Sequence, residues 1–476
     1  MCAHKYCKEK IWKKRFLLTK IKRCARKQQK KHGFKIKNYE LLCTFVDAMR
    51  ILIVNTSECT GGAAVAASRL CDALNNNGVK AKMMVRDKQT DDLTVVTGGG
   101  WKVKEKWCFY WERFVIWLNN RLSRQNLFKV SIANAGIDII STPEFQEADI
   151  IHLHWVNQGF LSLDGLRKIF KSGKPVVWTM HDMWPLTAIC HHAYDCEAFS
   201  TGCNQCHFLR HPGKNDLSAR VFRHKEKILE SLNVQQSLRF VAVSEWLAEK
   251  ARKSALIGHF PISVIPNVLS LQQFTIVDRT DARTALDINA RFVIAFGAAR
   301  LDDPIKGFDY LAEALRLVEG KWKDESRRDI HLLLFGTVRD ASIFDNLPVH
   351  YTHLGYVSDT YRLSEVYSAA NIVVSSSLYE TFGQTLIEAM ACGCVPVSFD
   401  GSGQTDIITH EKNGYLARRL STDSLADGIE WALQKSENEG ITLRKELRRS
   451  VVRRYGESVV ANQYLNLYQS VLSRND

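Results

Sequence analysis

Short apolar runs alternate with helical patterns along this chain and fall into two series. The first series comprises residues 49–55, 80–85, 148–154, 175–180, 239–243 and 261–265. The second comprises residues 291–297, 330–336, 353–356, 372–375, 395–399 and 414–416. Strands that are apolar along their whole length are buried on both faces, as in parallel sheets covered by helices. The sequence therefore predicts an α/β fold with two parallel sheets, one for each series.

The two series also predict the domain boundaries. The first domain is expected at residues 49–270 and the second at 285–456, because 266–290 is a polar and charged stretch typical of an interdomain linker. Residues 457–476 have a helical pattern, and we expect this helix to pack back across the linker. A chain of 476 residues is long enough for two domains with full cores.

Most of the net charge lies outside these two domains. The formal charge is +14, but residues 1–48 alone contain 15 Lys and Arg against 3 Asp and Glu. The remainder of the chain is therefore close to neutral, which argues against polyanion binding by the domains. We interpret residues 1–48 as a basic extension that is either disordered or not native. If it is part of the protein, we expect anionic lipid to be its partner.

The cellular compartment follows from what the sequence lacks. No stretch approaches the ~18 uncharged apolar residues of a membrane-spanning helix, and Lys and Arg interrupt every apolar stretch near the N-terminus, so no signal peptide is expected. We therefore expect a cytoplasmic protein, peripheral on the inner face of the membrane if it touches one. In that reducing compartment we expect the 13 cysteines to be buried residues, reactive thiols or metal ligands rather than disulfides.

The segment 375–393 carries the strongest functional pattern. Glu380 lies on a loop after a strand, and Glu388 lies seven residues further on, within the helix that follows. Loops at the carboxyl ends of parallel strands bind ligands. Gly383 allows close approach of the backbone, and the free N–H groups around Gln384 and Thr385 suit phosphate oxygens. Glu388 could accept hydrogen bonds from a ribose diol, and Glu380 from sugar hydroxyls.

This segment resembles the Glu-x7-Glu signature of family 4 retaining glycosyltransferases. The resemblance covers about residues 49–470 and implies the GT-B architecture, two Rossmann-like doubly wound domains that face each other across a cleft. It implies that the segment binds a nucleotide-sugar donor. The residues involved would be Glu380, Phe382, Gly383, Gln384, Thr385 and Glu388. It also implies that Arg300 and Lys306 hold the donor diphosphate, whose negative charge grows as the glycosidic bond breaks.

The first half carries further matches to this family. Gly61 and Gly62 resemble its glycine-rich loop beside the donor phosphates, and His181 resembles its active-site histidine. A histidine at a strand end could instead simply be hydrogen-bonded to Asp182. The run from His181 to Pro185 resembles bacterial exopolysaccharide enzymes of the colanic-acid type. Where many relatives have proline after the first glutamate, this chain has Thr381, which weakens any assignment of the donor sugar.

The resemblance implies transfer with retention of the anomeric configuration. The donor phosphate would take the proton of the acceptor on the same face, and Arg300 and Lys306 would hold the leaving group. No Asp-x-Asp metal motif precedes this chemistry, so we expect no cofactor for catalysis. The acceptor would be a polysaccharide or a lipid-linked glycan. A nucleotide-sugar epimerase and a phosphorylase-like enzyme of the same fold remain alternatives.

A cysteine cluster follows His181 closely. It consists of Cys190, Cys196, Cys203 and Cys206, and the last two form a Cys-x2-Cys knuckle that can present two thiolates to one ion. We interpret the cluster as a structural zinc site, with two disulfides or free thiols as alternatives. A nucleic-acid-binding protein that uses the knuckle and the basic extension is a further alternative, but it explains nothing of the Glu380 segment, and we expect no nucleic-acid partner.

Residues 101–124 combine aromatic and basic residues at helical spacing. The large apolar side chains of one broad face are Trp107, Tyr110, Trp111, Phe114, Trp117 and Leu118. Such a helix either packs on the first domain or lies at the surface of a membrane that carries a lipid-linked acceptor.

Overall fold

The computed structural model describes residues 49–98, 102–230, 237–321 and 329–473. Apart from Gly78–Lys80, the described residues from Arg50 onward belong to one compact unit, which contains both sheets. The expectations for residues 1–48 lie outside the described residues.

The first sheet has seven strands in the order β3-β2-β1-β4-β5-β6-β7. Parallel pairings join β1 to β4 and continue through β5 and β6 to β7. The strands of this sheet are β1 (Arg50–Ser57), β2 (Lys80–Asp87), β3 (Val95–Val96), β4 (Ile150–Leu153), β5 (Val176–Met180), β6 (Leu238–Ala242) and β7 (Ile262–Val264). The order reverses direction at the β1–β4 pair, as in a doubly wound sheet, and this switch point is where such sheets bind ligands.

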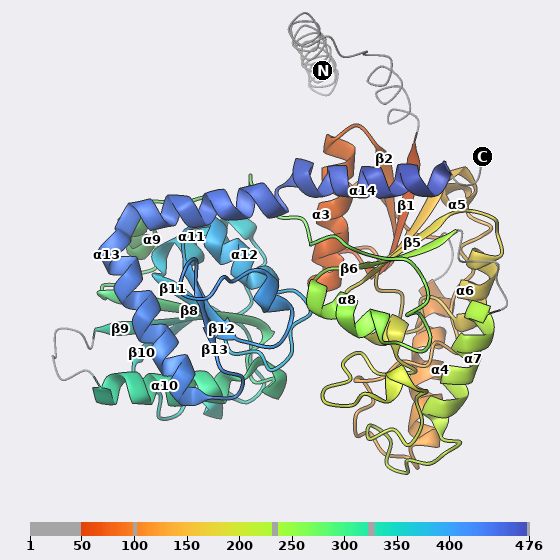
Figure 1. Ribbon diagram of the computed structural model, residues 1–476, viewed down its shortest axis with the longest axis horizontal. Coiled ribbons are helices and arrows are strands. Elements are labelled where there is room, and N and C mark those ends of the chain that lie inside the picture. The colour runs from red at the N-terminus through yellow and green to blue at the C-terminus, as the bar shows by residue number, and fades with distance from the viewer. Residues whose placement is uncertain (1–48, 99–101, 231–236, 322–328, 474–476) are drawn as a thin grey trace, which may run out of the picture. The chain divides into compact units, whose positions relative to one another are not determined.

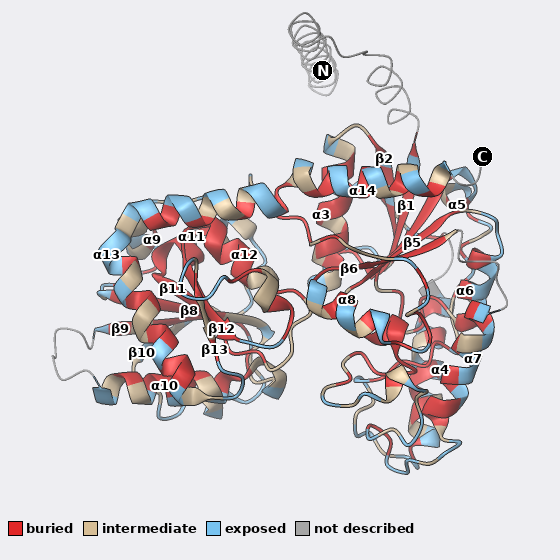
Figure 2. Ribbon diagram, in the orientation of Figure 1, coloured by how far each residue is buried: buried red, intermediate tan, exposed pale blue. Residues whose placement is uncertain are grey.

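The second sheet has six strands in the order β10-β9-β8-β11-β12-β13, with parallel pairings throughout. Its strands are β8 (Phe292–Arg300), β9 (Ile330–Thr337), β10 (His350–His353), β11 (Ile372–Ser375), β12 (Val395–Phe399) and β13 (Tyr415–Ala417). The switch point here is the β8–β11 pair. The central strands of both sheets are buried (Figure 2). The predicted α/β class with two parallel sheets is therefore confirmed.

Helices connect the strands of both sheets (Figure 1). In the first half they are α3 (Gly62–Asn76), α4 (Lys102–Asn119), α5 (Pro143–Glu147), α6 (Leu163–Phe170), α7 (Leu217–Glu230) and α8 (Glu245–Arg252). In the second half they are α9 (Arg279–Ala285), α10 (Phe308–Lys321), α11 (Thr360–Ala369), α12 (Gln384–Ala391), α13 (Thr422–Tyr455) and α14 (Glu457–Leu472). Short 3-10 turns are η1 (Trp184–Leu186), η2 (Ala198–Ser200), η3 (Pro304–Lys306), η5 (Ala341–Phe344) and η6 (Gly403–Asp406).

Three features differ from the sequence-based expectation. The edge strand β3 was not predicted, and β10 comprises His350–His353 rather than the expected residues 353–356. The third difference concerns the expected linker at 266–290. Its second part contains α9 and is bonded to the second domain, because the N–H groups of Thr275 and Val277 donate to hydroxyls of α11, and Arg283 donates to Asn371.

The C-terminal helices connect distant parts of the chain. α13 is interrupted at Gly440, whose φ of 48° and ψ of −127° are not helical. α14 then lies beside α3 (Figure 1). Its Tyr464 hydroxyl is 2.9 Å from Thr179 Oγ1, and its Tyr468 hydroxyl is 2.7 Å from His152 Nδ1. The last helix is thus hydrogen-bonded to β4 and β5 of the first sheet.

Among the described residues, no helix combines the length and the apolar character that crossing a bilayer requires.

Candidate active site

A cavity of about 530 Å³ lies at the carboxyl ends of strands from both sheets. From the first half, Asn55 and Ser57 end β1, Trp155 follows β4, and His181 follows β5. From the second half the lining includes the last part of β8, the end of β11 and the start of α12. Both switch points of the fold therefore open on one cavity.

Nine of the predicted site residues line this cavity. They are Gly61, Gly62, His181, Lys306, Glu380, Phe382, Gly383, Gln384 and Thr385. Two predicted residues, Arg300 and Glu388, are not among the described residues that line it.

Two helices begin at the cavity, and neither has a side-chain cap. The residue before α3 is Gly61, with φ of 92°, and the residue before α12 is Gly383, with φ of 109°. Both angles lie in the region that favours glycine. A Cβ atom at Gly62 would be 3.6 Å from Gln384 Oε1, so the two helix starts are close to each other. Free N–H groups and the positive ends of two helix dipoles therefore meet in the cavity, which suits an anion.

Lys306 is positioned by a tight turn. It ends η3, and the following Gly307 has φ of 66°. Ser376 Oγ donates to the Gly307 carbonyl at 2.7 Å, and a Cβ atom at Gly307 would lie only 2.1 Å from the Ser376 carbonyl oxygen. The Lys306 ammonium is 3.1 Å from Glu380 Oε2, and both side chains are only partly exposed. The predicted phosphate-binding cation and the predicted sugar-binding carboxylate thus form an ion pair with each other.

Arg300, the second predicted cation, contacts acidic neighbours on its own loop. Its guanidinium lies 3.5 Å from Asp302 and 3.4 Å from Asp303. To bind a diphosphate, this side chain would have to exchange at least one of these carboxylates for phosphate oxygens. Its predicted role stays a prediction.

Glu388 has buried protein partners. Its Oε1 atom is 2.7 Å from Arg69 of α3, and its Oε2 atom accepts a hydrogen bond of 3.3 Å from Tyr367 of α11. Glu388 as a whole residue is buried. Its position on the predicted helix agrees with the sequence analysis, whereas its role as a ribose acceptor stays a prediction.

His181 forms a hydrogen bond with a second histidine rather than with Asp182. Its Nε2 atom is 2.8 Å from Nδ1 of His154, which follows β4. Burial lowers the pKa of His181 to about 4, with a smaller opposing effect from Asp182. Burial also lowers the pKa of His154 well below its ordinary value. Both rings are therefore neutral near pH 7, and His181 can act as a neutral hydrogen-bonding group at the cavity wall.

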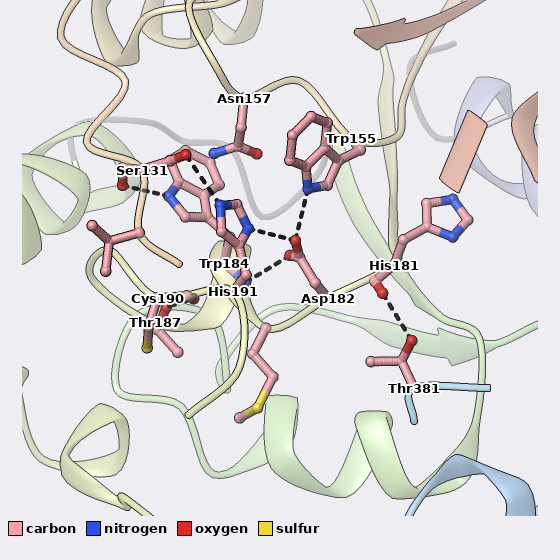
Figure 3. Close-up of polar contacts among 12 residues, drawn as sticks. Ser131, Trp155, Asn157, His181, Asp182, Trp184, Thr187, Cys190, His191 and Thr381 are labelled. Carbon is pink, nitrogen blue, oxygen red and sulfur yellow. Dashed lines mark hydrogen bonds and ion pairs between the residues drawn. The ribbon is translucent and has the colours of Figure 1, made fainter. Parts of the chain in front are cut away.

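Asp182 organises a separate buried network beside His181 (Figure 3). Its carboxylate accepts from Trp155 Nε1 at 2.7 Å, from His191 Nδ1 at 2.6 Å and from the Trp184 N–H at 2.8 Å. Burial alone would raise the pKa of Asp182, but the charge and hydrogen bond of His191 and the Trp184 N–H lower it below its ordinary value. The network fixes Trp155, whose position after β4 places it in the cavity lining.

Thr381 joins the two halves of the site. Its hydroxyl donates to the His181 carbonyl at 2.8 Å (Figure 3). Its own carbonyl accepts from Ser244 Oγ at 2.7 Å. Proline at this position has no hydroxyl and could not form the first bond. The departure from the family pattern therefore has a local structural role.

Several cavity residues were not identified as site residues from the sequence, among them Asn55, Trp155, His192, Asn267 and Tyr379. Asn55 lies near the end of β1 and Trp155 lies just beyond β4, so for these two residues the strand ends gave a signal in the sequence. His192 Nδ1 and Gln384 Nε2 are buried and have no hydrogen-bond partner among the described residues. Both atoms are free to contact a ligand.

The cysteine cluster lies beside the first domain core. Cys190 is buried, and Cys196, Cys203 and Cys206 are partly buried against the core. Burial raises the pKa of Cys203 to about 11 and that of Cys206 to about 12. All four thiols are free, and no group of three or more His, Cys, Asp or Glu side chains in the described part of the chain is placed to hold a metal ion. Zinc binds thiolates, whereas the raised pKa values favour neutral thiols. The predicted zinc site stays a prediction.

Comparison with known proteins agrees with this arrangement. Residues 60–273 match the model of Glycosyltransferase Family 4, and residues 278–450 match that of Glycosyl transferases group 1. The two models together account for most of the chain and meet at the boundary between the two sheets. The chain belongs to the family 4 glycosyltransferases.

Two curated relatives and one solved structure illustrate the likeness. The chain is 30% identical over 240 residues to phosphatidyl-myo-inositol mannosyltransferase of Mycobacterium tuberculosis, covering 48% of this chain and 59% of that protein. It is 22% identical over 334 residues to WcaC of Escherichia coli, a glycosyl transferase named for colanic acid biosynthesis, covering 68% and 76%.

The solved structure is HepE of Anabaena in complex with UDP and glucose. It aligns with a TM-score of 0.56 at 15% identity and covers 89% of this chain and all of that one. At this identity the likeness concerns the fold, and it confirms the predicted GT-B architecture. The chain spans less than two thirds of the length of the mycobacterial relative.

Proposed function

We propose that this glycosyltransferase moves a sugar from a nucleotide-sugar donor, with retention of configuration, to a polysaccharide or lipid-linked glycan acceptor in cell-surface polysaccharide synthesis. The observation that carries the proposal is the convergence of two uncapped helix N-termini and Lys306 on one cavity. These groups would hold a diphosphate and stabilise the charge that develops on it as it leaves.

The Lys306–Glu380 ion pair fits a donor with both a phosphate and a sugar. When a diphosphate binds, Lys306 would exchange Glu380 for phosphate oxygens, which frees the carboxylate to accept hydrogen bonds from sugar hydroxyls. Neutral His181 would contact the sugar from the opposite half of the cavity. Gln384 Nε2 and His192 Nδ1, which lack protein partners, would complete the polar lining.

The proposed reaction needs no enzyme nucleophile. An acceptor oxygen would bond to the anomeric carbon on the face from which the diphosphate departs. As the carbon–oxygen bond to phosphate breaks, its electron pair stays on the diphosphate, and the acceptor proton moves to a phosphate oxygen. The helix N-termini and Lys306 would stabilise the negative charge, and Arg300 would assist if it leaves Asp302 and Asp303.

The comparisons support the donor and the acceptor classes. HepE binds UDP and glucose, which supports a uridine nucleotide sugar as the first donor to try. The mycobacterial relative is named for a phospholipid acceptor and WcaC for an exopolysaccharide, which supports a glycan acceptor that is carried on a lipid or exported to the surface.

A screen of nucleotide sugars for thermal stabilisation of the protein tests the donor site. Binding at 100 times the dissociation constant should stabilise the wild type by about 2.7 kcal/mol. The Lys306→Gln variant should lose most of this stabilisation and about 100-fold in transfer rate. The matched control is Lys321→Gln, because Lys321 pairs with Asp427 and is not among the described cavity residues.

Four results would contradict the proposal. One is a wild type that no nucleotide sugar stabilises, and another is a Lys306→Gln variant that responds like the Lys321→Gln control. The other two come from product analysis. Turnover without an acceptor would instead identify an epimerase, and turnover that requires free phosphate would identify a phosphorylase-like enzyme.

A further inference from the structure

The helix α4 differs from an ordinary surface helix, because it buries charged residues beside Cys108 and Ile116 and exposes most of its large aromatic side chains. Glu112 is 0% exposed, and Arg113 and Asn120 are also buried. In contrast, Trp107 is 58% exposed and Tyr110 is 67% exposed. A surface helix of a globular domain normally turns its apolar stripe toward the core.

Buried polar bonds fix this orientation. Glu112 Oε1 accepts the N–H groups of Ile132 and Ala133, both at 2.8 Å, and Oε2 lies 3.0 Å from Arg113. Arg113 in turn donates to the Val130 carbonyl at 3.1 Å. Rotating the helix to bury its aromatic stripe would break these bonds and leave charges unpaired, so the outward aromatic stripe is built into the fold.

The exposed side chains form one continuous surface. Trp107 stacks on Trp111 with ring centroids 5.3 Å apart, and the series continues to Phe114 at 5.8 Å. We call this surface the α4 aromatic face. Its exposed members are Val103, Trp107, Tyr110, Trp111, Phe114 and Leu118, with Leu122 and Phe128 just beyond the helix. Eight of the fourteen exposed large hydrophobic residues in the described part of the chain thus lie within residues 103–128.

The exposed charged residues of the stretch 103–129 all have the same sign. Both acidic residues within 103–129, Glu105 and Glu112, are buried. The exposed charged residues of that stretch are Lys104, Lys106, Arg121, Arg124 and Lys129. The basic rim continues onto a second segment, because the exposed Arg220 donates to Asn119, and the N–H of the exposed Arg210 donates to Asn120.

We propose that the α4 aromatic face and its basic rim dock this protein on the surface of an anionic lipid bilayer. Tryptophan and tyrosine side chains favour the interface between lipid headgroups and acyl chains, and Lys and Arg near it gain from anionic headgroups. A second copy of the chain is the less suitable occupant, because a two-fold contact through this face would bring two basic rims together.

Vesicle sedimentation of the full chain tests this proposal without any glycosyl donor, so its result is independent of the proposed transfer reaction. We expect the wild type to bind vesicles of equimolar phosphatidylcholine and phosphatidylglycerol, to bind less in high salt, and to bind pure phosphatidylcholine weakly. The triple variant Trp107→Ser/Trp111→Ser/Phe114→Ser should bind at least about tenfold more weakly. The double variant Lys104→Glu/Lys106→Glu should bind anionic vesicles about tenfold more weakly, with no change in its binding to pure phosphatidylcholine.

The control is a triple variant with exposed apolar residues elsewhere, Leu93→Ser/Tyr361→Ser/Ile441→Ser, which should bind like the wild type. A second readout uses lipids with brominated acyl chains, which quench tryptophan at the interface. Trp107→Phe/Trp111→Phe should keep vesicle binding and lose much of this quenching.

Either of two results would overturn the proposal. In the first, the thermal unfolding curve shows that the aromatic triple variant is folded, and this variant still binds vesicles like the wild type. Lipid affinity would then belong to another part of the chain, such as residues 1–48. If the wild type forms a dimer that the triple variant loses and neither binds vesicles, the α4 aromatic face is a contact between copies of the chain.

Discussion

At the scale of single residues, the two glutamates of the signature have different surroundings. Their spacing could be read from the sequence, and so could the loop and the helix that carry them. The partners could not, because Arg69 and Tyr367 reach Glu388 from separate helices, and Lys306 reaches Glu380 from another loop. Local sequence patterns indicate which side chains lie on the loop and the helix near the site. Contacts between distant segments decide which of these side chains stay free to bind a ligand.

Buried histidines make the stability of the protein sensitive to acid. The pKa of His181 is lowered to about 4 and that of His152 to about 3, both mainly by burial, against an ordinary value of 6.5. The unfolded chain therefore binds more protons than the native protein below pH 6.5. Stability is fully present above that pH, and the loss from His181 is complete near pH 4.

We expect the free energy of unfolding to fall by roughly 1.4 kcal/mol per pH unit for each such histidine over this window. Urea denaturation at a series of pH values from about 7 to about 4, roughly the range over which histidine titrates, measures how the free energy of unfolding depends on pH. The variant His154→Gln should reduce the slope of the unfolding free energy against pH by about 1.4 kcal/mol per pH unit, which corresponds to one proton. An unchanged slope would show that His154 is not kept neutral in the native state.

At the scale of elements, most strands were predicted from their apolar runs, because a buried parallel strand needs apolar residues throughout. β11 and β12 agree with the sequence analysis to the residue. β3 has only two residues, too few to show a pattern, and β10 is largely exposed, so its residues are polar. α9 was assigned to the linker because a seven-residue polar helix has little apolar periodicity.

The start of α12 should be sensitive to the loss of its glycine. At Gly383 an added Cβ would adopt an unfavourable φ of 109° and meet Ile407 Cδ1 at 3.1 Å. Gly383→Ala should destabilise the fold by about 1–2 kcal/mol and displace the N–H groups that face the cavity. Gly173→Ala is the matched control, because Gly173 also has a positive φ, of 80°, but an added Cβ there would meet nothing.

Thermal unfolding with and without nucleotide sugar separates the two effects of this substitution. Both variants should unfold at lower temperature than the wild type, but only Gly383→Ala should lose the stabilisation by the donor. Equal donor stabilisation in the two variants would remove α12 from the phosphate site.

At the scale of the whole molecule, buried polar contacts join helices that are far apart in sequence. Arg69 of α3 pairs with Glu388 of α12, and the two side chains are each 9% exposed. The sequence could not reveal this pair, since each residue alone looks like an ordinary helical charge. The same holds for the bonds of Tyr464 and Tyr468 to the first sheet, although the helical pattern of 457–476 was visible.

Removing one member of the buried pair should be much more harmful than removing both. Arg69→Met should lower the free energy of unfolding by about 3–5 kcal/mol, because it leaves the Glu388 carboxylate buried without its cation. The double variant Arg69→Met/Glu388→Leu should recover a large part of that loss. A double-mutant cycle in urea measures the coupling, and additive effects of the two substitutions would contradict a direct pair.

The two uncapped helix starts have an electrostatic consequence for folding. The positive ends of α3 and α12 repel each other and repel Lys306, whereas the Glu380 carboxylate beside Lys306 opposes this repulsion. If a diphosphate binds there as proposed, it would relieve this repulsion as a counter-ion between the two helix starts. The proposed donor would in that case contribute to the electrostatics of the native structure as well as to the reaction.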